Sequence, residues 1–89
     1  MSSEKQEGQL KPISPARVAE ELKRLRHQRA TGELDHDEYE HRFARMIGEL
    51  RDRRIDGTCA EIMAVLGPLR GTGIDAADFD RLTKQLGLA

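Results

Sequence analysis

The sequence is short of aromatic residues and has no long apolar run, and each shortage limits what the chain can be. Tryptophan is absent and aromatic residues make up 3% of the 89 residues, so the core must be aliphatic and thin. No run of about 18 apolar residues exists, so we expect neither a transmembrane helix nor a membrane partner. The opening stretch MSSEKQEGQLKP lacks the apolar segment of a signal peptide, so we expect a cytoplasmic protein.

An excess of charge of one sign is also missing. Lys and Arg total 15 against 16 Asp and Glu, which gives a formal net charge of -1. The chain therefore lacks the overall positive field that draws general nucleic-acid binders to phosphate, and any basic patch must be local. The single cysteine, Cys59, has no partner for an internal disulfide and is too few for a Cys-based zinc site. We expect its side chain to be a small buried apolar group.

The sequence offers no recognisable set of catalytic or metal-binding residues. Its three histidines are His27, His36 and His41. The last two are five residues apart, which turns them about 140° from each other on a helix of 3.6 residues per turn, so they do not ligate one metal from one face. No nucleophile, base and orienting residue stand together either. We therefore expect a protein that is not an enzyme and binds no cofactor or metal.

Apolar periodicity and helix-capping residues predict an all-α chain with four helices. Ser14 is suited to cap a first helix that begins at Pro15, because proline lacks the N–H that would be unpaired there. Three further starts are marked by Asp35 and Thr58, each with Glu three residues on, and by Asp75. The predicted helices span residues 15–30, 36–55, 59–66 and 76–86. Residues 1–12 are polar and predict a disordered tail, which leaves residues 13–89 as a single helical domain.

The first two predicted helices form an antiparallel hairpin, because only Thr31-Gly32-Glu33-Leu34 connects them. We expect Gly32 to adopt a positive φ past the end of the first helix. Opposite charges would meet at both ends of such a hairpin. At one end we expect Arg24, Arg26 and Arg29 to face Asp35, Asp37, Glu38 and Glu40. At the other end we expect Glu20 and Glu21 to face the basic stretch RDRR at 51–54.

Residues 22–50 carry a Leu-rich first helix, the motif Gly-x-Leu-Asp-x-x-Glu-Tyr-Glu and a basic, apolar second helix. The matching residues are Leu22, Leu25, Gly32, Leu34, Asp35, Glu38, Tyr39, Glu40 and Ile47. This stretch resembles the SHOCT (short C-terminal) domain, a helical hairpin. The resemblance implies a role in interaction or oligomerisation and carries no catalytic residue. The chain departs from that pattern by extending the second helix to residue 55 and by adding two more helices.

The predicted helix 59–66, CAEIMAVL, is apolar on nearly every side, because Glu61 is its one polar residue. Such a helix needs cover on more than one side, from the other helices or from a second molecule. We therefore predict a protein-protein interaction module, an adaptor, accessory subunit or regulator, that self-associates or docks on a larger protein. The expected contact residues are Ile62, Met63, Val65 and Leu66 from this helix and Phe43 and Ile47 from the preceding one. The alternative is a nucleic-acid-binding transcriptional regulator that places the stretches KRLRHQR or RDRR on phosphate.

Overall fold

A computed structural model describes residues 11–88, and over that range the protein is helical with no strand. The elements are α2 (Pro15–Ala30), α3 (His36–Arg53), α4 (Cys59–Leu66), the 3-10 turn η1 (Gly67–Leu69) and α5 (Ala76–Leu86). The predicted all-α class is thereby confirmed for the described residues. None of these helices has both the length and the apolar character that crossing a bilayer requires. Of the predicted tail, Lys11 and Pro12 are described and the remainder lies outside the described residues.

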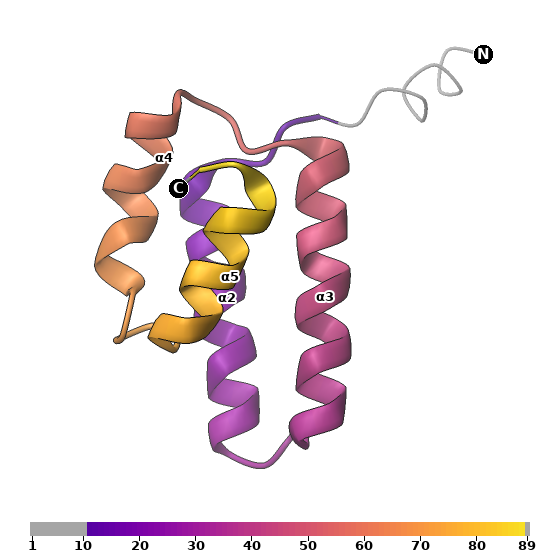
Figure 1. Ribbon diagram of the computed structural model, residues 1–89. Coiled ribbons are helices and arrows are strands. Elements are labelled where there is room, and N and C mark those ends of the chain that lie inside the picture. Colours follow the sequence, from indigo (N-terminus) through magenta and orange to yellow (C-terminus); the bar gives the residue numbers. More distant parts are fainter. Residues whose placement is uncertain (1–10, 89) are drawn as a thin grey trace, which may run out of the picture.

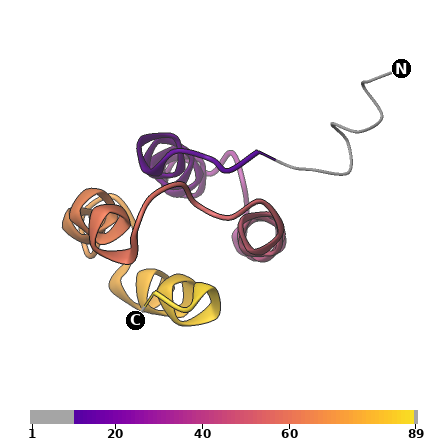
Figure 2. The same cartoon turned by 90° about the horizontal axis from the view of Figure 1, so that it is seen from above.

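The helices are grouped around one core. In Figure 1, α2 and α3 lie side by side and are joined by a short turn, while α4 stands on the other side of α2. Seen from above in Figure 2, α5 faces α2 across the centre, with α3 and α4 to either side. Each described helix contributes a fully buried side chain: Leu22, Phe43, Leu66 and Leu82. α5 therefore covers the inner side of the α2–α3 pair and leaves its outer side open.

Helix starts follow the capping residues of the sequence. The Ser14 hydroxyl accepts from the backbone N–H of Arg17 at 3.2 Å. The backbone N–H of Glu38 donates to Asp35 Oδ1 at 2.8 Å, and the Glu38 carboxylate accepts from the N–H of Asp35 at 2.9 Å. Thr58 forms the same reciprocal box at the start of α4. These contacts pair N–H groups that a helix start would otherwise leave without a partner. The helices begin where the sequence predicted, so these starts are confirmed.

Asp75 stands at the N-cap of α5 as predicted, but its side chain does not cap the helix. Its carboxylate turns toward α2, where it accepts from Arg29 Nη2 at 3.0 Å and from Arg26 Nε at 3.4 Å. Two guanidinium groups therefore hold a carboxylate that local sequence assigns to its own helix. The prediction of a side-chain cap at Asp75 was wrong, because tertiary ion pairing replaced the local hydrogen bond.

The second predicted helix ends two residues early, at Arg53 rather than at residue 55. Arg54 adopts φ 72° and ψ 153°, a conformation that L side chains rarely take. This turn brings the next residues beside the chain that enters α2, where the N–H of Ile13 donates to the Arg54 carbonyl at 3.0 Å. The N–H of Asp56 in turn donates to the Ile13 carbonyl at 2.8 Å. The helix is thus cut short by pairing between two segments that are distant in sequence.

Candidate functional site

The structure buries four of the six side chains that the sequence assigns to a partner contact. Phe43 and Ile47 of α3 and Ile62 and Leu66 of α4 all belong to the chain's own core. Met63 is half-buried, and Val65 is 41% exposed. The other helices therefore cover the inner side of α4, so a partner that binds the folded chain can touch only its outer side.

Cys59 is exposed, which contradicts the expectation of a buried side chain. It lies in the first turn of α4, beyond the core positions filled by Ile62 and Leu66. Its thiol donates to the Leu88 carbonyl at 3.4 Å. The prediction failed because Ile62 and Leu66 are the residues by which α4 enters the core, and Cys59 lies outside that contact. Cys59 instead lies beside Leu88, near the C-terminal end of the described chain.

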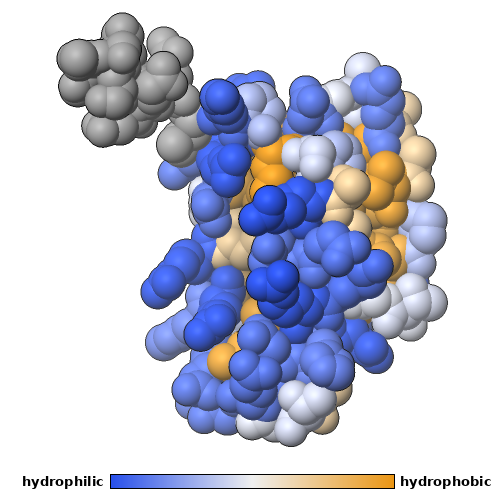
Figure 3. Space-filling view, turned by 180° about the vertical axis from the view of Figure 1, so that it is seen from behind, coloured by the Kyte–Doolittle hydropathy of each residue, from blue (hydrophilic) through white to orange (hydrophobic). Residues whose placement is uncertain are grey.

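A groove of about 550 Å³ lies between α2 and α3. We call it the α2–α3 groove. Its apolar floor is formed by Ile13, Val18, Leu25, Met46 and Leu50. Figure 3 shows the molecule from behind, where hydrophilic side chains flank a strip of hydrophobic surface. The groove lies on the side of the α2–α3 pair that α5 does not cover.

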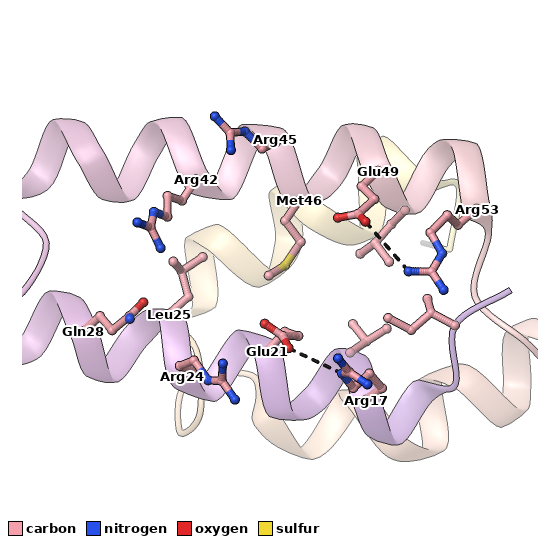
Figure 4. Close-up of a pocket in the computed structure, with 13 residues that line it drawn as sticks. Arg17, Glu21, Arg24, Leu25, Gln28, Arg42, Arg45, Met46, Glu49 and Arg53 are labelled. Atoms are coloured by element: carbon pink, nitrogen blue, oxygen red, sulfur yellow. Dashed lines mark hydrogen bonds and ion pairs between the residues drawn. The ribbon is translucent and has the colours of Figure 1, made fainter. Parts of the chain in front are cut away.

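Polar residues of the two helices form the walls of the groove. From α2 they are Arg17, Glu21, Arg24 and Gln28, and from α3 they are Arg42, Arg45, Glu49 and Arg53. Within each wall the residues recur every three or four positions, which places them along one side of a helix. Figure 4 shows Leu25 and Met46 projecting between the helices and Arg42 extending from α3 toward the same space. Five arginines against two glutamates give the groove a positive charge in a chain whose net charge is -1.

Both glutamates of the groove pair with an arginine of their own helix. Glu21 Oε2 lies 3.4 Å from Arg17 Nε, and Glu49 Oε2 lies 3.7 Å from Arg53 Nη1. These pairs occupy the end of the groove next to Ile13, as Figure 4 shows for the four charged side chains. The positive charge of that end is therefore largely compensated.

The rest of the groove carries arginines that no carboxylate of residues 11–88 neutralises. Arg24, Arg42 and Arg45 are exposed and form no ion pair with residues 11–88. Arg24 and Arg42 lie toward the Gln28 end of the groove, and Arg45 lies nearer its middle, with its guanidinium turned away from α2 in Figure 4. The groove is thus asymmetric, with paired charges at one end and unpaired guanidinium groups toward the other.

The ion pairs expected across the hairpin do not form in the described structure. Arg26 and Arg29 bind Asp75 at the start of α5, and Glu20 and Glu21 pair within α2. The carboxylates of Asp35 and Glu38 are used in the capping box of α3. The expected pairing was therefore wrong at both ends. One result is that Arg24 forms no ion pair among residues 11–88.

Sequence reasoning missed the groove, although a signal for it was present. Arg17, Glu21, Arg24 and Gln28 are spaced by four, three and four residues, and the α3 wall has the matching spacing of three, four and four. Two polar rows beside two apolar rows on neighbouring helices predict a charged border along their junction. The sequence analysis treated these arginines by their position along the chain rather than by the side of the helix that they share.

Residues 11–88 contain no group of three or more His, Cys, Asp or Glu side chains that could hold a metal ion. His27, His36 and His41 are all exposed. Searches against protein-family models, curated proteins and solved structures found no match to this chain. The α2–α3 groove is therefore the feature on which a functional argument rests.

Proposed function

We propose that this chain is a small, non-enzymatic protein-interaction module whose contact surface is the α2–α3 groove. The observation that carries the proposal is the presence of three unpaired arginines beside a concave apolar floor. Arg51, Arg54 and Lys84 also form no ion pair with residues 11–88. What distinguishes Arg24, Arg42 and Arg45 is that all three line one groove with an apolar floor. Guanidinium groups that have no carboxylate partner among the described residues are suited to bind one brought by a partner protein.

The resemblance of residues 22–50 to the SHOCT domain supports this proposal, because the role it implies is interaction or oligomerisation. We interpret α2 and α3 as the antiparallel hairpin of that motif, with α4 and α5 as two shorter helices packed on its inner side. The groove then lies on the outer side of the hairpin. We propose that the protein acts in the cytoplasm as an adaptor, accessory subunit or regulator.

A larger protein suits the groove better than a second copy of the chain. Two α2–α3 grooves brought face to face would place unpaired arginines opposite one another, and like charges repel. Val65 is the sole exposed large hydrophobic side chain in the described residues, so little other apolar surface is left to join two copies. Sedimentation at micromolar concentration tests this choice. A dimer that Val65→Asp converts to monomer would transfer the contact surface to α4.

The experiment that tests the function is affinity capture from the native host, run in parallel with two charge-reversed variants. Arg42→Glu alters the groove, and Lys84→Glu makes a matched change on the exposed surface of α5. We expect mass spectrometry to find a protein retained by the wild type and by Lys84→Glu but lost by Arg42→Glu. Identical sets of retained proteins from all three forms would contradict the assignment of the groove.

Nucleic-acid binding is the second candidate, because the same unpaired arginines could contact phosphate. Binding of this kind weakens steeply with salt, since each phosphate contact releases counterions. A mixed-sequence duplex titrated at two salt concentrations tests it directly. Steep salt-dependent binding that Arg42→Glu abolishes and Lys84→Glu preserves would favour this function over a protein partner.

A further inference from the structure

We propose that the occupant of the α2–α3 groove is an acidic, amphipathic helix of a partner protein. The inference rests on the proposed function and adds the chemical class of the partner segment and its orientation by charge. Three features of the groove carry it: length, the apolar floor and the uneven distribution of charge.

The length of the groove matches a short helix. Its α2 wall runs from Arg17 to Gln28 and its α3 wall from Arg42 to Arg53. At a rise of about 1.5 Å per residue each wall is about 17 Å long, which corresponds to about three helical turns. A helix laid along this groove presents side chains at i, i+3, i+4 and i+7 to the floor, and that is the usual form of helix-in-groove recognition.

The floor selects apolar side chains. Val18, Leu25 and Leu50 are almost completely buried, while Met46 and Ile13 are half-buried and present their remaining surface to the groove. Met46 lies at the centre and is unbranched, so it adapts to the shape of an apolar side chain placed against it. Burial of apolar surface here supplies affinity that does not depend on salt.

The arginine walls select carboxylates on both flanks of that apolar row. Arg24 lies on the α2 wall and Arg42 on the α3 wall, so acids on both sides of the occupant have a guanidinium within the groove lining. Arginine binds a carboxylate through two parallel hydrogen bonds, which fixes geometry as well as charge. Because Glu21 and Glu49 neutralise the Ile13 end, the acids of the occupant belong at the middle and the Gln28 end.

The same features disfavour a nucleic acid as occupant. Glu21 and Glu49 neutralise Arg17 and Arg53, so a phosphate backbone laid along the whole groove would meet unpaired arginines over only part of its length. No aromatic residue lines the groove, so bases have nothing to stack on. A phosphate backbone makes no favourable contact with an apolar floor. A helix with an apolar row and acidic flanks can contact both the floor and the arginines of the walls.

Two cross-linked helical peptides of about three turns test the proposal by fluorescence anisotropy with the full chain. Both carry the same leucine row, and one has Glu on both flanks where the other has Gln. We expect saturable binding of the Glu peptide and about tenfold weaker binding of the Gln peptide, because charge-assisted hydrogen bonds are lost. Equal binding of the two peptides, or no binding of either, would overturn the proposal.

Variants locate the interaction. Arg42→Gln should weaken binding of the Glu peptide by about three- to tenfold and leave the Gln peptide unchanged, since that peptide has no carboxylate to lose. Lys84→Gln should change neither, and matching melting curves show that both variants fold. A labelled mixed-sequence duplex serves as the third ligand. If the duplex binds and weakens with Arg42→Gln while the Glu peptide does not bind, the occupant is a nucleic acid.

Failure of this inference is distinct from failure of the proposed function. A captured protein that is retained by the wild type and lost by Arg42→Glu supports the interaction module even if the Glu peptide does not bind. In that case the groove has a protein partner whose contact segment is not an acidic helix. If capture also shows no dependence on Arg42, both proposals fail together.

Discussion

The hydroxyl of Tyr39 on α3 donates a 2.6 Å hydrogen bond to the carboxylate of Asp78 on α5. The Tyr39 ring is stacked on Phe43 at 5.9 Å and lies under the guanidinium of Arg29 at 4.5 Å. Burial, and then the Asp78 carboxylate, raise the pKa of Tyr39 above its usual range. The Tyr39 side chain thereby connects α3 to α5 through a polar contact at the edge of the core.

Stability should therefore fall at alkaline pH. The folded protein favours neutral Tyr39 more than the unfolded chain does, so its contribution is complete below about pH 10 and is lost as pH rises further. Tyr39 is the sole tyrosine, so tyrosinate absorbance reports this group alone. We expect ionisation to coincide with loss of helical circular dichroism. A tyrosinate signal at its ordinary pKa in a fully helical protein would contradict the structure.

Tyr39→Phe should lower the free energy of unfolding by about 1–3 kcal/mol at neutral pH, because the half-buried Asp78 carboxylate loses its donor. The variant should also lose less stability between neutral and alkaline pH than the wild type does. Chemical denaturation at both pH values measures the two effects. Arg29 and Arg81 remain 3.9 and 3.8 Å from Asp78 and limit the loss.

Arg54→Gly should stabilise the protein by about 1 kcal/mol, because glycine adopts the φ of 72° without the strain that a Cβ introduces. The control is Arg51→Gly in the last turn of α3, which should destabilise by up to about 1 kcal/mol, since glycine weakens a helix. Thermal melting of both variants measures the difference. A loss of stability in both variants would show that the interactions of the Arg54 side chain stabilise the fold by more than the strain of its positive φ destabilises it.

Two glycine-to-alanine changes should act in opposite directions. Gly32 has φ +84° in the turn between α2 and α3, so Gly32→Ala should cost roughly 1 kcal/mol. Gly48 lies within α3 with nothing within 4 Å of an added Cβ, so Gly48→Ala should stabilise by about 0.5–1 kcal/mol. Urea denaturation distinguishes the signs. A stabilising Gly32→Ala would contradict the turn conformation.

Asp35→Ala and Asp75→Ala should both destabilise, and salt should separate their causes. Asp35 caps α3, so its loss should cost about 0.5–2 kcal/mol with little dependence on salt. Asp75 acts through ion pairs with Arg26 and Arg29 that are almost half exposed, so its effect should be at most about 1 kcal/mol and should shrink in high salt. Melting at low and high ionic strength tests this.

The starts of the helices could be predicted because they depend on residues three or four positions apart. Asp35 and Glu38 lie within one helical turn, so their reciprocal hydrogen bonds do not depend on how the rest of the chain packs. Arg29 and Asp75 are separated by 46 residues, so their pairing depends on where α5 packs, and the sequence placed Arg29 opposite the wrong acids. The groove was missed for the same reason, since Arg24 and Arg42 line one surface only after two helices are set side by side.

The early end of α3 belongs to this second class. No local pattern marks Arg54 for a positive φ, which follows from hydrogen bonds between its segment and Ile13. A glycine at this position would have indicated a positive φ, whereas an arginine gives no such indication. Similarly, the exposure of Cys59 depends on how far the core extends beneath α4 rather than on the apolar character of the helix.

The pairing of Ile13 with the segment between α3 and α4 also determines how the molecule bears load. The backbone of Ile13 is held by Arg54 on one side and by Asp56 on the other, and Arg53 donates to the Lys11 carbonyl at 3.0 Å. A pulling force applied ahead of Lys11 acts on these three hydrogen bonds before it acts on α2. Tension from the N-terminal side therefore reaches the end of α3 through these hydrogen bonds as well as α2 through the chain itself.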